Sequence, residues 1–379
     1  MYRLAAAFVV VVGAANLVGV AAARPEASAD RYIVVLKTAV SPSAVASLHA
    51  QQYGAQVEFV YGHALAGYAA VIPAHRLAEV QADENVAYVE ADGEMSAAAQ
   101  ILPWGIDKID ADISSTRAGD GSGAVTNVNA YIIDTGIDYG HADLNASSSR
   151  HVNFANGPNK DCHGHGTHVA GTVAARDNAT DVAGVAPGVT LWGVKVLGCG
   201  GSGSNAGVIA GIDWVTANAV KPAVANMSLG GSFSQAVNDA VIRSANSGVF
   251  YALAAGNSGA NACNSSPASA GAGTNNGIMT VAATDSADTE ASWSNYGSCV
   301  DTWAPGVSIL STRKGGGTTT MSGTSMASPH GAGGGALYLS GHPSASAASV
   351  EGALKAAATD TGRSSKDGRR IMREYVGGF

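Results

Sequence analysis

The chain has 379 residues, a length that suits one large domain together with a small one. Charged residues make up only 13%, against about 25% in ordinary soluble domains, and 29 acidic against 21 basic residues leave a net charge of -8. This balance argues against a nucleic-acid-binding surface, favours solubility and gives no sign of an anionic partner.

The N-terminus has the pattern of a targeting segment. Arg3 precedes an apolar run over 4–20, and the three alanines over 21–23 form the small-residue pattern at which signal peptides are cleaved. A membrane anchor is the alternative, but glycine and asparagine interrupt the run and polar residues follow it at once. We predict a signal peptide over 1–23 and a secreted, extracellular protein without a membrane partner.

A small domain is predicted next, over 24–96. Runs rich in β-branched residues alternate with helical spacing in the order β-α-β-β-α-β, which predicts an α+β ferredoxin-like domain. The expected elements are a strand over 31–37, a helix over 41–53, two strands within 56–72, a helix over 74–83 and a strand over 87–90. The small residues over 96–100 form a linker suited to cleavage.

The rest of the chain alternates apolar strands with helical stretches, the pattern of an α/β domain whose parallel sheet is covered by helices on both faces. Strands are expected over 130–135, 191–197, 224–229, 249–254 and 278–283. Helices are expected over 166–175, 205–218, 235–247, 324–339 and 346–357. Reactive side chains should then gather at the carboxyl ends of the strands and the adjoining helix starts.

Three motifs of small residues each hold one reactive side chain at such a position. They read AYIIDTG over 130–136, GHGTHVAGT over 164–172 and GTSMASPH over 323–330. A serine hydroxyl such as that of Ser325 is a poor nucleophile unless an imidazole accepts its proton. The imidazole of His165 in turn needs a carboxylate, here Asp134, to fix its tautomer. The motifs therefore predict nucleophilic acyl transfer.

These motifs and their Asp, His, Ser order resemble the subtilisin-like serine proteases, most closely the proteinase K and aqualysin branch, over residues 30–361. The order is informative because α/β-hydrolases read Ser, Asp, His and the chymotrypsin group reads His, Asp, Ser. A serine esterase is disfavoured because Ala327 replaces the second glycine of G-x-S-x-G.

The resemblance implies a subtilisin-like catalytic domain over 97–361, a secreted serine endopeptidase made as a self-processing zymogen. The domain over 24–96 then acts as an inhibitor-type propeptide, an intramolecular partner that is cut away near Ala97. A domain retained in the mature protein is the alternative. We expect a monomer that acts on protein and peptide substrates, without nucleic acid.

The resemblance also implies the role of each catalytic residue. Ser325 attacks the scissile carbonyl, His165 takes the proton and Asp134 holds the imidazole. His163 and His168 are rivals for the base, but the first histidine of H-G-T-H is the base in this family. A zinc site built from the three histidines lacks the glutamate of H-E-x-x-H.

The remaining site residues follow from the same resemblance. The side chain of Asn257 joins the backbone N–H of Ser325 as an oxyanion donor, although an Asn in a glycine-rich turn is often only a turn residue. The substrate-binding residues are Gly201, Ser202, Gly203, Ser228, Leu229, Gly230, Ala254, Ala255 and Gly256. None is charged, which favours a broad preference for apolar or aromatic residues.

Four cysteines in a secreted chain suggest two disulfides, for which three connectivities exist. The resemblance implies the pairs Cys162–Cys199 and Cys263–Cys299, each worth about 2–4 kcal/mol. A free Cys162 close to His165 is the alternative.

A structural calcium ion is the one cofactor that the resemblance implies, and the chemistry itself needs none. Asp301 would supply a carboxylate, and Asn276 and Ile278 would supply carbonyl oxygens. Asn276 replaces the proline usual in the family. Asp301 as a turn or capping residue is the alternative.

Two departures from the family bear on stability. Four glycines within 331–335 follow His330, and each interior glycine costs a helix about 1 kcal/mol relative to alanine. Residues 362–379 begin with a basic, polar run and are expected to form a disordered tail. These departures keep an alternative open: a catalytically weak subtilase homologue that acts as a secreted binding protein.

Overall fold

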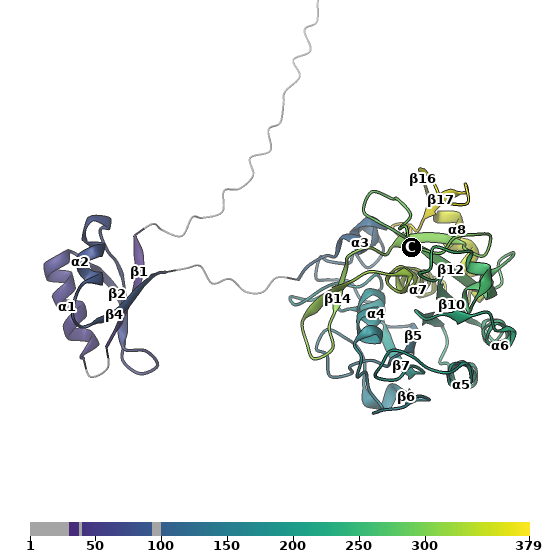
Figure 1. The fold of residues 1–379 in the computed structure, drawn as a ribbon, viewed down its shortest axis with the longest axis horizontal. Coiled ribbons are helices and arrows are strands. Elements are labelled where there is room, and N and C mark those ends of the chain that lie inside the picture. The colour runs from purple at the N-terminus through teal and green to yellow at the C-terminus, as the bar shows by residue number, and fades with distance from the viewer. Residues whose placement is uncertain (1–29, 38–39, 93–99) are drawn as a thin grey trace, which may run out of the picture. The chain divides into compact units, whose positions relative to one another are not determined.

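The computed structural model describes residues 30–37, 40–92 and 100–379 (Figure 1). The chain divides into two compact units, Met1–Ala97 and Ala98–Phe379, called here the small unit and the large unit. The signal peptide predicted over 1–23 and the cleavage predicted near Ala97 lie outside the described residues. Within the described ranges, no helix has the length and apolarity needed to cross a bilayer.

The small unit has the predicted order of strands and helices. In chain order its main elements are β1 (Arg31–Leu36), α1 (Pro42–Tyr53), β2 (Gln56–Tyr61), β3 (Gly67–Val71), α2 (Leu77–Gln81) and β4 (Val86–Ala91). The strands form an antiparallel sheet in the order β2-β3-β1-β4. The α+β prediction is therefore confirmed.

One face of this small sheet packs on the helices and the other is open. Val34 of β1 and Tyr68 of β3 are fully buried against α1 and α2. By strand register, Phe59 and Tyr88 lie on the opposite face, where they are 60% and 53% exposed. Two aromatic side chains are therefore exposed to solvent on this face of the small sheet.

The large unit is built on a nine-stranded sheet, parallel from β17 to β6, with β16 antiparallel to β17. In sheet order the strands are β16 (Thr359–Ser364), β17 (Arg370–Arg373), β13 (Thr302–Pro305), β12 (Ile278–Thr284), β10 (Val249–Ala254), β8 (Ala223–Met227), β5 (Asn129–Asp134), β7 (Thr190–Lys195) and β6 (His151–Asn153). Two small antiparallel pairs stand apart: β9 (Gly231–Ser232) with β11 (Ser265–Ser266), and β14 (Ile309–Thr312) with β15 (Thr318–Met321).

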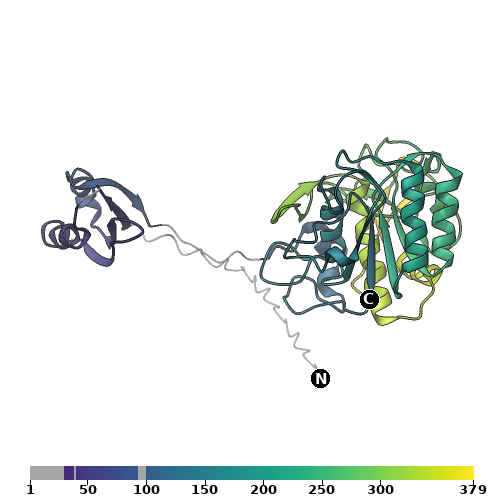
Figure 2. The same cartoon turned by 90° about the horizontal axis from the view of Figure 1, so that it is seen from below.

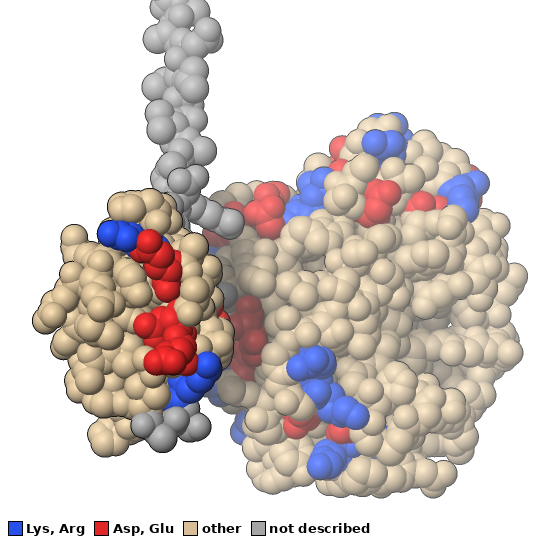
Figure 3. All heavy atoms as spheres, turned by 60° about the vertical axis from the view of Figure 1, so that its left-hand side comes forward, with Lys and Arg blue, Asp and Glu red and all other residues tan. Residues whose placement is uncertain are grey.

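Helices cover both faces of this sheet, as the sequence predicts. They are α3 (Trp104–Lys108), α4 (His165–Ala174), α5 (Asn205–Asn218), α6 (Gln235–Asn246), α7 (Thr324–Gly341) and α8 (Ala347–Ala357). One core cluster joins the sheet to α4, α7 and α8, and another joins its opposite face to α5 and α6. The helices α5 and α6 lie side by side (Figure 2). The face of the large unit in Figure 3 carries few charged side chains.

The predicted disordered tail over 362–379 is wrong. Residues 359–364 and 370–373 form the hairpin β16–β17, and β17 joins the edge of the main sheet beside β13. Ile371 is fully buried there, so the polar run contains a core position that its composition hides. The large unit therefore extends past 361 to the last residue.

Basic side chains attach this hairpin to the rest of the large unit by binding backbone carbonyls. The ammonium of Lys366 donates to the carbonyls of Ala291, Ser292 and Ser294. Arg369 donates to the Val300 carbonyl at 2.9 Å and lies over the Trp303 ring. Cations that bind backbone carbonyls order a segment whose charge density alone suggests disorder.

Residues after β17 form backbone hydrogen bonds with residues near the start of the large unit. The N–H of Val376 donates to the Ile109 carbonyl, and the Phe379 carbonyl accepts the N–H of Ser115. Val376 is fully buried.

The glycine run lies inside an unbroken helix. All residues over 331–335 are buried in α7, and large side chains occupy the space where Cβ atoms would be. A Cβ on Gly333 would lie 2.5 Å from Val185, and one on Gly335 would lie 2.6 Å from Phe250. The glycines thus allow α7 to approach its neighbours closely, which compensates for their low helix propensity.

Candidate active site

The three predicted reactive residues lie at the edge where the parallel strands end. Asp134 is the last residue of β5, His165 is the first residue of α4, and Ser325 is the second residue of α7. Asp134 is fully buried, whereas the His165 side chain is 20% exposed. Asp134 Oδ1 accepts a hydrogen bond from His165 Nδ1 at 2.8 Å. Nδ1 therefore carries a proton, and Nε2 is left as the acceptor of the neutral imidazole.

The environment of His165 favours its charged form. Burial disfavours the imidazolium, but the Asp134 charge and the hydrogen bond outweigh burial, with a further contribution from Asp161. The pKa of His165 is therefore raised above its usual value. Such a histidine binds a proton more readily than a free imidazole does.

Asp161, which the sequence analysis missed, organises the start of α4. Its Oδ1 accepts the backbone N–H groups of His163 and Gly164 at 2.9 and 2.8 Å and the Thr135 hydroxyl at 3.0 Å. Its Oδ2 accepts the Thr167 N–H at 3.0 Å and the Thr167 hydroxyl. This buried carboxylate caps the helix that begins at His165 and ties it to the residue after Asp134. The sequence signal that could have identified Asp161 as a capping residue is its position shortly before the start of a predicted helix.

The turn at Ser325 is held by a buried hydroxyl and amide network. Ser228 Oγ donates to the Ser325 carbonyl at 2.7 Å, and Asn226 Nδ2 donates to Ser228 Oγ at 2.9 Å. Ser328 Oγ donates to Asn226 Oδ1 at 3.0 Å, which closes the network. Ser325 Oγ itself donates to the Ser228 carbonyl at 3.1 Å. The backbone of Ser325 is thus fixed independently of its side-chain rotamer.

Asn257 is oriented by Thr324, the first residue of α7. Its Oδ1 accepts both the N–H and the hydroxyl of Thr324 at 2.8 Å. Because the oxygen is used in this way, Nδ2 is the end that can donate into the cleft. Ser325 lies in the first turn of α7, where N–H groups have no partner within the helix.

Two adjoining hollows collect the predicted substrate-binding residues. The first, of about 370 Å³, is lined by Leu229, Gly230, Ala254, Ala255, Gly256, Asn257 and Ser325 among others, and no charged residue lines it. The second, of about 230 Å³, brings Gly201, Ser202 and Gly203 together with Leu229 and Gly230. Ser228 lines neither hollow. Its hydroxyl donates to the Ser325 carbonyl, and its carbonyl accepts the Ser325 hydroxyl. The sequence analysis missed the polar side chains of Asn261, Asn264 and Asn295 in the first hollow.

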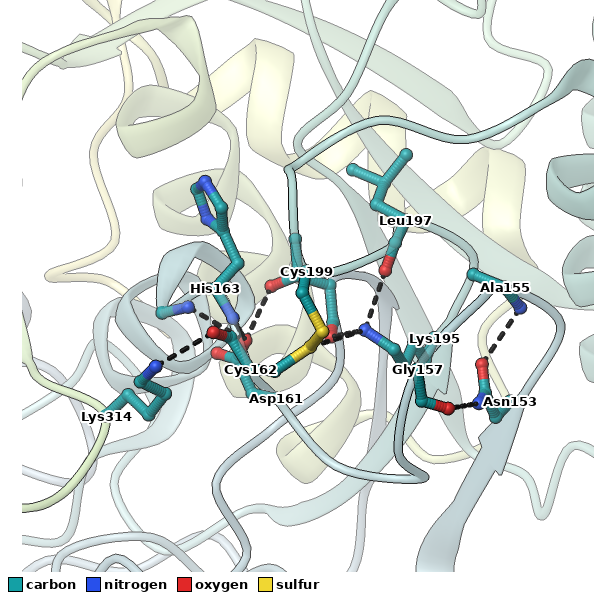
Figure 4. The surroundings of a disulfide bond; sticks show 12 residues. Asn153, Ala155, Gly157, Asp161, Cys162, His163, Lys195, Leu197, Cys199 and Lys314 are labelled. Carbon is teal, nitrogen blue, oxygen red and sulfur yellow. Dashed lines mark hydrogen bonds between the residues drawn. A yellow bond between two sulfur atoms is a disulfide. The ribbon is translucent and has the colours of Figure 1, made fainter.

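Both disulfides have the pairing that the resemblance implies, Cys162–Cys199 and Cys263–Cys299. The first joins the loop before His165 to the loop that leads into Gly201 (Figure 4). The buried ammonium of Lys195 lies beneath it and donates to the Leu197 carbonyl at 2.8 Å. The disulfide and this lysine therefore connect the loop before His165 to the loop that carries Gly201.

The other two histidines of the motif lie in different surroundings. His168 is fully buried and bonds the Ile309 carbonyl through Nε2 at 3.0 Å, and burial lowers its pKa to about 4. It is a neutral structural residue. His163 is exposed. Among the described residues, no group of three or more His, Cys, Asp or Glu side chains is arranged to hold a metal ion.

The residues expected to bind calcium do not fit a calcium ion. Asp301 Oδ1 pairs with Lys355 Nζ at 2.9 Å, and its Oδ2 accepts the Thr280 N–H at 2.8 Å. Burial raises the pKa of Asp301 to about 6, with Lys355 acting in the opposite direction. An ammonium group thus occupies the position beside this carboxylate that a divalent cation would need.

A second carboxylate binds the backbone N–H groups near Asp301. Glu351 Oε2 accepts the N–H groups of Asn276 and Ile278 at 2.7 and 3.3 Å, and its Oε1 pairs with Lys355 at 3.0 Å. A single protein ammonium therefore pairs with both buried carboxylates, and this region gives a calcium ion no role.

Comparison with known proteins agrees with this geometry. The subtilase family matches residues 127–370, and the peptidase inhibitor I9 family matches residues 31–98. The chain belongs to the subtilase family. It is a serine-type endopeptidase with an I9 propeptide at its N-terminus.

Two relatives match most of this chain. The chain is 44% identical over 362 residues to the extracellular serine proteinase of Thermus sp. (strain Rt41A), and the match covers 87% of this chain and 85% of that protein. It is 43% identical over 363 residues to alkaline serine exoprotease A of Vibrio alginolyticus, which covers 89% of this chain and 65% of that protein.

A solved structure shows the same fold. The crystal structure of a cold-adapted subtilisin-like serine proteinase is 42% identical and superposes with a TM-score of 0.64, covering 73% of this chain and 98% of that one. The subtilisin-like α/β fold predicted from the motifs is confirmed.

Proposed function

We propose that this subtilase is a secreted endopeptidase that cleaves peptide bonds through an acyl-enzyme on Ser325, with His165 as general base and Asp134 as its orienting carboxylate. The observation that carries the proposal is the 2.8 Å hydrogen bond between Asp134 and His165 at the edge that also holds Ser325. Ser325 borders the uncharged hollow, so a substrate carbonyl held there is within reach of the hydroxyl.

In the first step the Ser325 hydroxyl turns from the Ser228 carbonyl toward His165 Nε2. His165 takes the proton as the C–O bond forms, and the carbonyl becomes a tetrahedral oxyanion. The imidazolium then gives the proton to the leaving amine, and water repeats the sequence to release the acid. Asp134 keeps the imidazolium paired throughout, which the raised pKa of His165 reflects.

The oxyanion would be met by two donors, the Asn257 amide and the Ser325 backbone N–H. Thr324 fixes the Asn257 oxygen, so the amide need not reorganise as charge develops. In subtilisin, a member of the same family, loss of the side-chain donor to the oxyanion costs about 100- to 1,000-fold in turnover. We expect a loss on that scale for Asn257→Ala here.

Substrate preference follows from the first hollow. Its apolar walls at Leu229 and Ala254 favour an apolar or aromatic residue, and its lack of charged residues disfavours basic or acidic ones. The substrate backbone would pair in extended form with residues 201–203 and 228–230, which leaves the side chains free to vary.

The small unit would act as the chain's own inhibitor until Ser325 cuts the linker near Ala97. The I9 match over 31–98 supports this role. Secretion is supported by the signal-peptide pattern over 1–23 and by a Thermus relative named extracellular serine proteinase.

The test compares the full chain with its Ser325→Ala variant by intact mass and by hydrolysis of succinyl-Ala-Ala-Pro-Phe p-nitroanilide. We expect the wild type to lose about residues 1–96 and to cleave the anilide, and the variant to stay uncut and inactive. Ser340→Ala, at the far end of the same helix, is the matched control and should behave as wild type. A folded wild type that remains full length and inert would contradict the proposal.

A further inference from the structure

His151, the first residue of β6, is a buried histidine that has no role in the proposed catalysis. Its Nε2 accepts the backbone N–H of Ile137 at 3.0 Å, and Ile137 is three residues after Asp134. Because Nε2 is an acceptor, the proton of the neutral ring is on Nδ1, which donates to Asn159 Oδ1 at 2.7 Å. The Asn159 amide donates in turn to the His151 carbonyl at 3.1 Å. These bonds fix both the tautomer and the orientation of the ring.

The ring of His151 is enclosed between β7 and the turn over 134–137. A Cβ placed on Gly193, its partner in β7, would lie 2.2 Å from its Cδ2. A Cβ placed on Gly136 would lie 2.8 Å from its Nε2, and Gly136 has a left-handed φ of +100° that a glycine adopts readily. The imidazole therefore packs directly on the turn.

This turn begins with Asp134 and is tied to the start of α4. Thr135 Oγ1 accepts the Gly166 N–H at 2.9 Å, and the Ile137 carbonyl accepts the Asp161 N–H at 3.2 Å. The imidazole of β6 holds the same turn from the edge of the main sheet. Without this acceptor, the buried Ile137 N–H would lose the partner that the structure gives it, and the turn would have to move to find another.

Three titratable side chains face this ring from the elements packed against it. They are Tyr139 from the loop after β5, Asp161 from the loop before α4 and Lys195 from β7. The Tyr139 ring is edge to face with the imidazole, with centroids 5.8 Å apart. The guanidinium of Arg150, the preceding residue, donates instead to the carbonyls of Leu191 and Asn145. The ring thus faces one cation and one anion.

These surroundings favour the neutral form of His151. Burial lowers its pKa below the usual value, and the Lys195 charge lowers it further, whereas the hydrogen bond to Asn159 and the Asp161 charge oppose this. Protonation in acid would turn Nε2 into a donor that faces the Ile137 N–H. The neutral ring can support the turn, and the charged ring cannot.

We propose that His151 is a positioning residue for the reaction, whose neutral Nε2 holds the turn that sets the placement of Asp134 against His165. The inference rests on the proposed function, because His151 acts through these two residues. It also gives the enzyme a second acid-sensitive step besides protonation of His165, since a charged His151 releases the turn.

Two polar substitutions separate the acceptor from the rest of the side chain. His151→Gln puts an amide oxygen near the position of Nε2, whereas the shorter His151→Asn reaches toward Asn159 and leaves Ile137 without its acceptor. The processed enzymes are compared at pH 8.5 on succinyl-Ala-Ala-Pro-Phe p-nitroanilide. We expect kcat of His151→Asn to fall about 10- to 100-fold with KM little changed, the scale of a small misplacement of a catalytic group. His151→Gln should retain most of the activity.

The pH profile supplies a readout that a purely structural role would not move. His165 titrates in both the wild type and His151→Gln, whereas only the wild type can lose the acceptor of Ile137 by protonation. The wild-type kcat/KM divided by that of His151→Gln should be constant above the ordinary histidine pKa of about 6.5 and should fall at lower pH, by up to about 10-fold. Far-UV circular dichroism selects the pH range over which both enzymes remain folded.

His342→Asn, exposed just after α7, is the matched control for the loss of a histidine and should behave as wild type. Equal kcat values in His151→Asn and His151→Gln, a raised KM without loss of kcat, or a ratio that does not change with pH overturns the proposal. If His151→Asn fails to fold, the pH dependence of the ratio decides, because it does not use that variant. A wild type that does not cleave the anilide contradicts the proposed function instead.

Discussion

Two helices bring the reactive residues into place, and they are held in different ways. At α4, which begins at His165, polar groups hold the first turn, where Asp161 accepts its N–H groups. At α7, which carries Ser325, close packing holds the helix body along the glycines over 331–335. The proposed base is thus positioned by hydrogen bonds and charge, whereas the helix that carries the proposed nucleophile is held by shape along its body and by hydrogen bonds only at the Ser325 turn.

This difference predicts that substitutions near the two helices will affect different properties of the enzyme. Changes of charge near α4 should alter catalysis and its pH dependence while the fold survives. Changes of volume along α7 should alter stability first, because an overpacked core strains the whole sheet.

The largest expected effect is that of Asp134→Asn on the α4 side. Removing the charge should lower kcat/KM by about 10,000-fold, the scale found when the orienting carboxylate of such a triad becomes an amide. Because Asp134 raises the pKa of His165, wild-type activity should rise with pH through a limb above about 6.5. In the variant this limb should move to lower pH, measured as kcat/KM against pH. An unshifted limb would contradict the assignment.

Asp161→Asn should give a smaller loss, because it acts on the placement of His165. We expect kcat to fall between about 10- and 100-fold, the scale of a small misplacement of a catalytic group, with KM little changed. Asp120→Asn, an exposed residue that bonds only its own turn, is the control. A raised KM without loss of kcat would show that Asp161 serves the substrate edge instead.

On the α7 side, Gly335→Ala should destabilise the fold by about 1–3 kcal/mol, because its Cβ would meet the Phe250 ring at 2.6 Å. Gly341→Ala, in the last turn of the same helix, meets nothing within 4 Å and should instead gain up to about 1 kcal/mol from helix propensity. Chemical denaturation of the inactive Ser325→Ala background measures both. Equal effects at the two sites would show that packing does not hold α7.

Glu374, which lies against α7, should make the stability of the fold depend on pH. The carboxyl is fully buried beside Gly331, and burial raises its pKa well above the usual value, although the Thr302 hydroxyl acts against this. A raised folded-state pKa stabilises the fold at low pH, and this stability is lost as the pH rises from about 4.5 toward the folded-state pKa. Glu374→Gln should therefore raise Tm at pH 8 relative to wild type by more than at pH 4. Equal shifts at both pH values would contradict a neutral carboxyl.

The smallest expected effect is that of chelation. Since Lys355 pairs with both Asp301 and Glu351, EDTA should shift Tm little, whereas Lys355→Met should lower it by leaving two buried carboxylates without a counter-charge. A large EDTA effect on the wild type would show that a metal ion is needed after all.

Local pattern was enough to predict the elements that carry the site. The five parallel strands and five helices predicted in the large unit all exist, with bounds within two residues, because each is a long apolar or periodic run between glycine or polar turns. The motifs also placed Asp134 and His165 where the structure brings them together.

Long-range compensation could not be predicted in the same way. Composition marks the basic run over 362–370 as disordered, yet Lys366 and Arg369 meet carbonyls far away in the chain. Likewise Asp301 belongs to a pattern associated with calcium, and only the fold reveals that Lys355 lies beside it. A sequence pattern shows which conformation a segment favours in isolation. The conformation and contacts of these residues instead depend on neighbours that are distant in sequence.

The contacts of β17 and the residues after it have a consequence for the order of folding. Val376 and Phe379 bond to Ile109 and Ser115, and β17 pairs with β13. These contacts join the first and last segments of the large unit, and contacts between residues so far apart in sequence are slow to form because a long loop must close first. It follows that this edge of the main sheet is completed late in folding, whichever strands pair first.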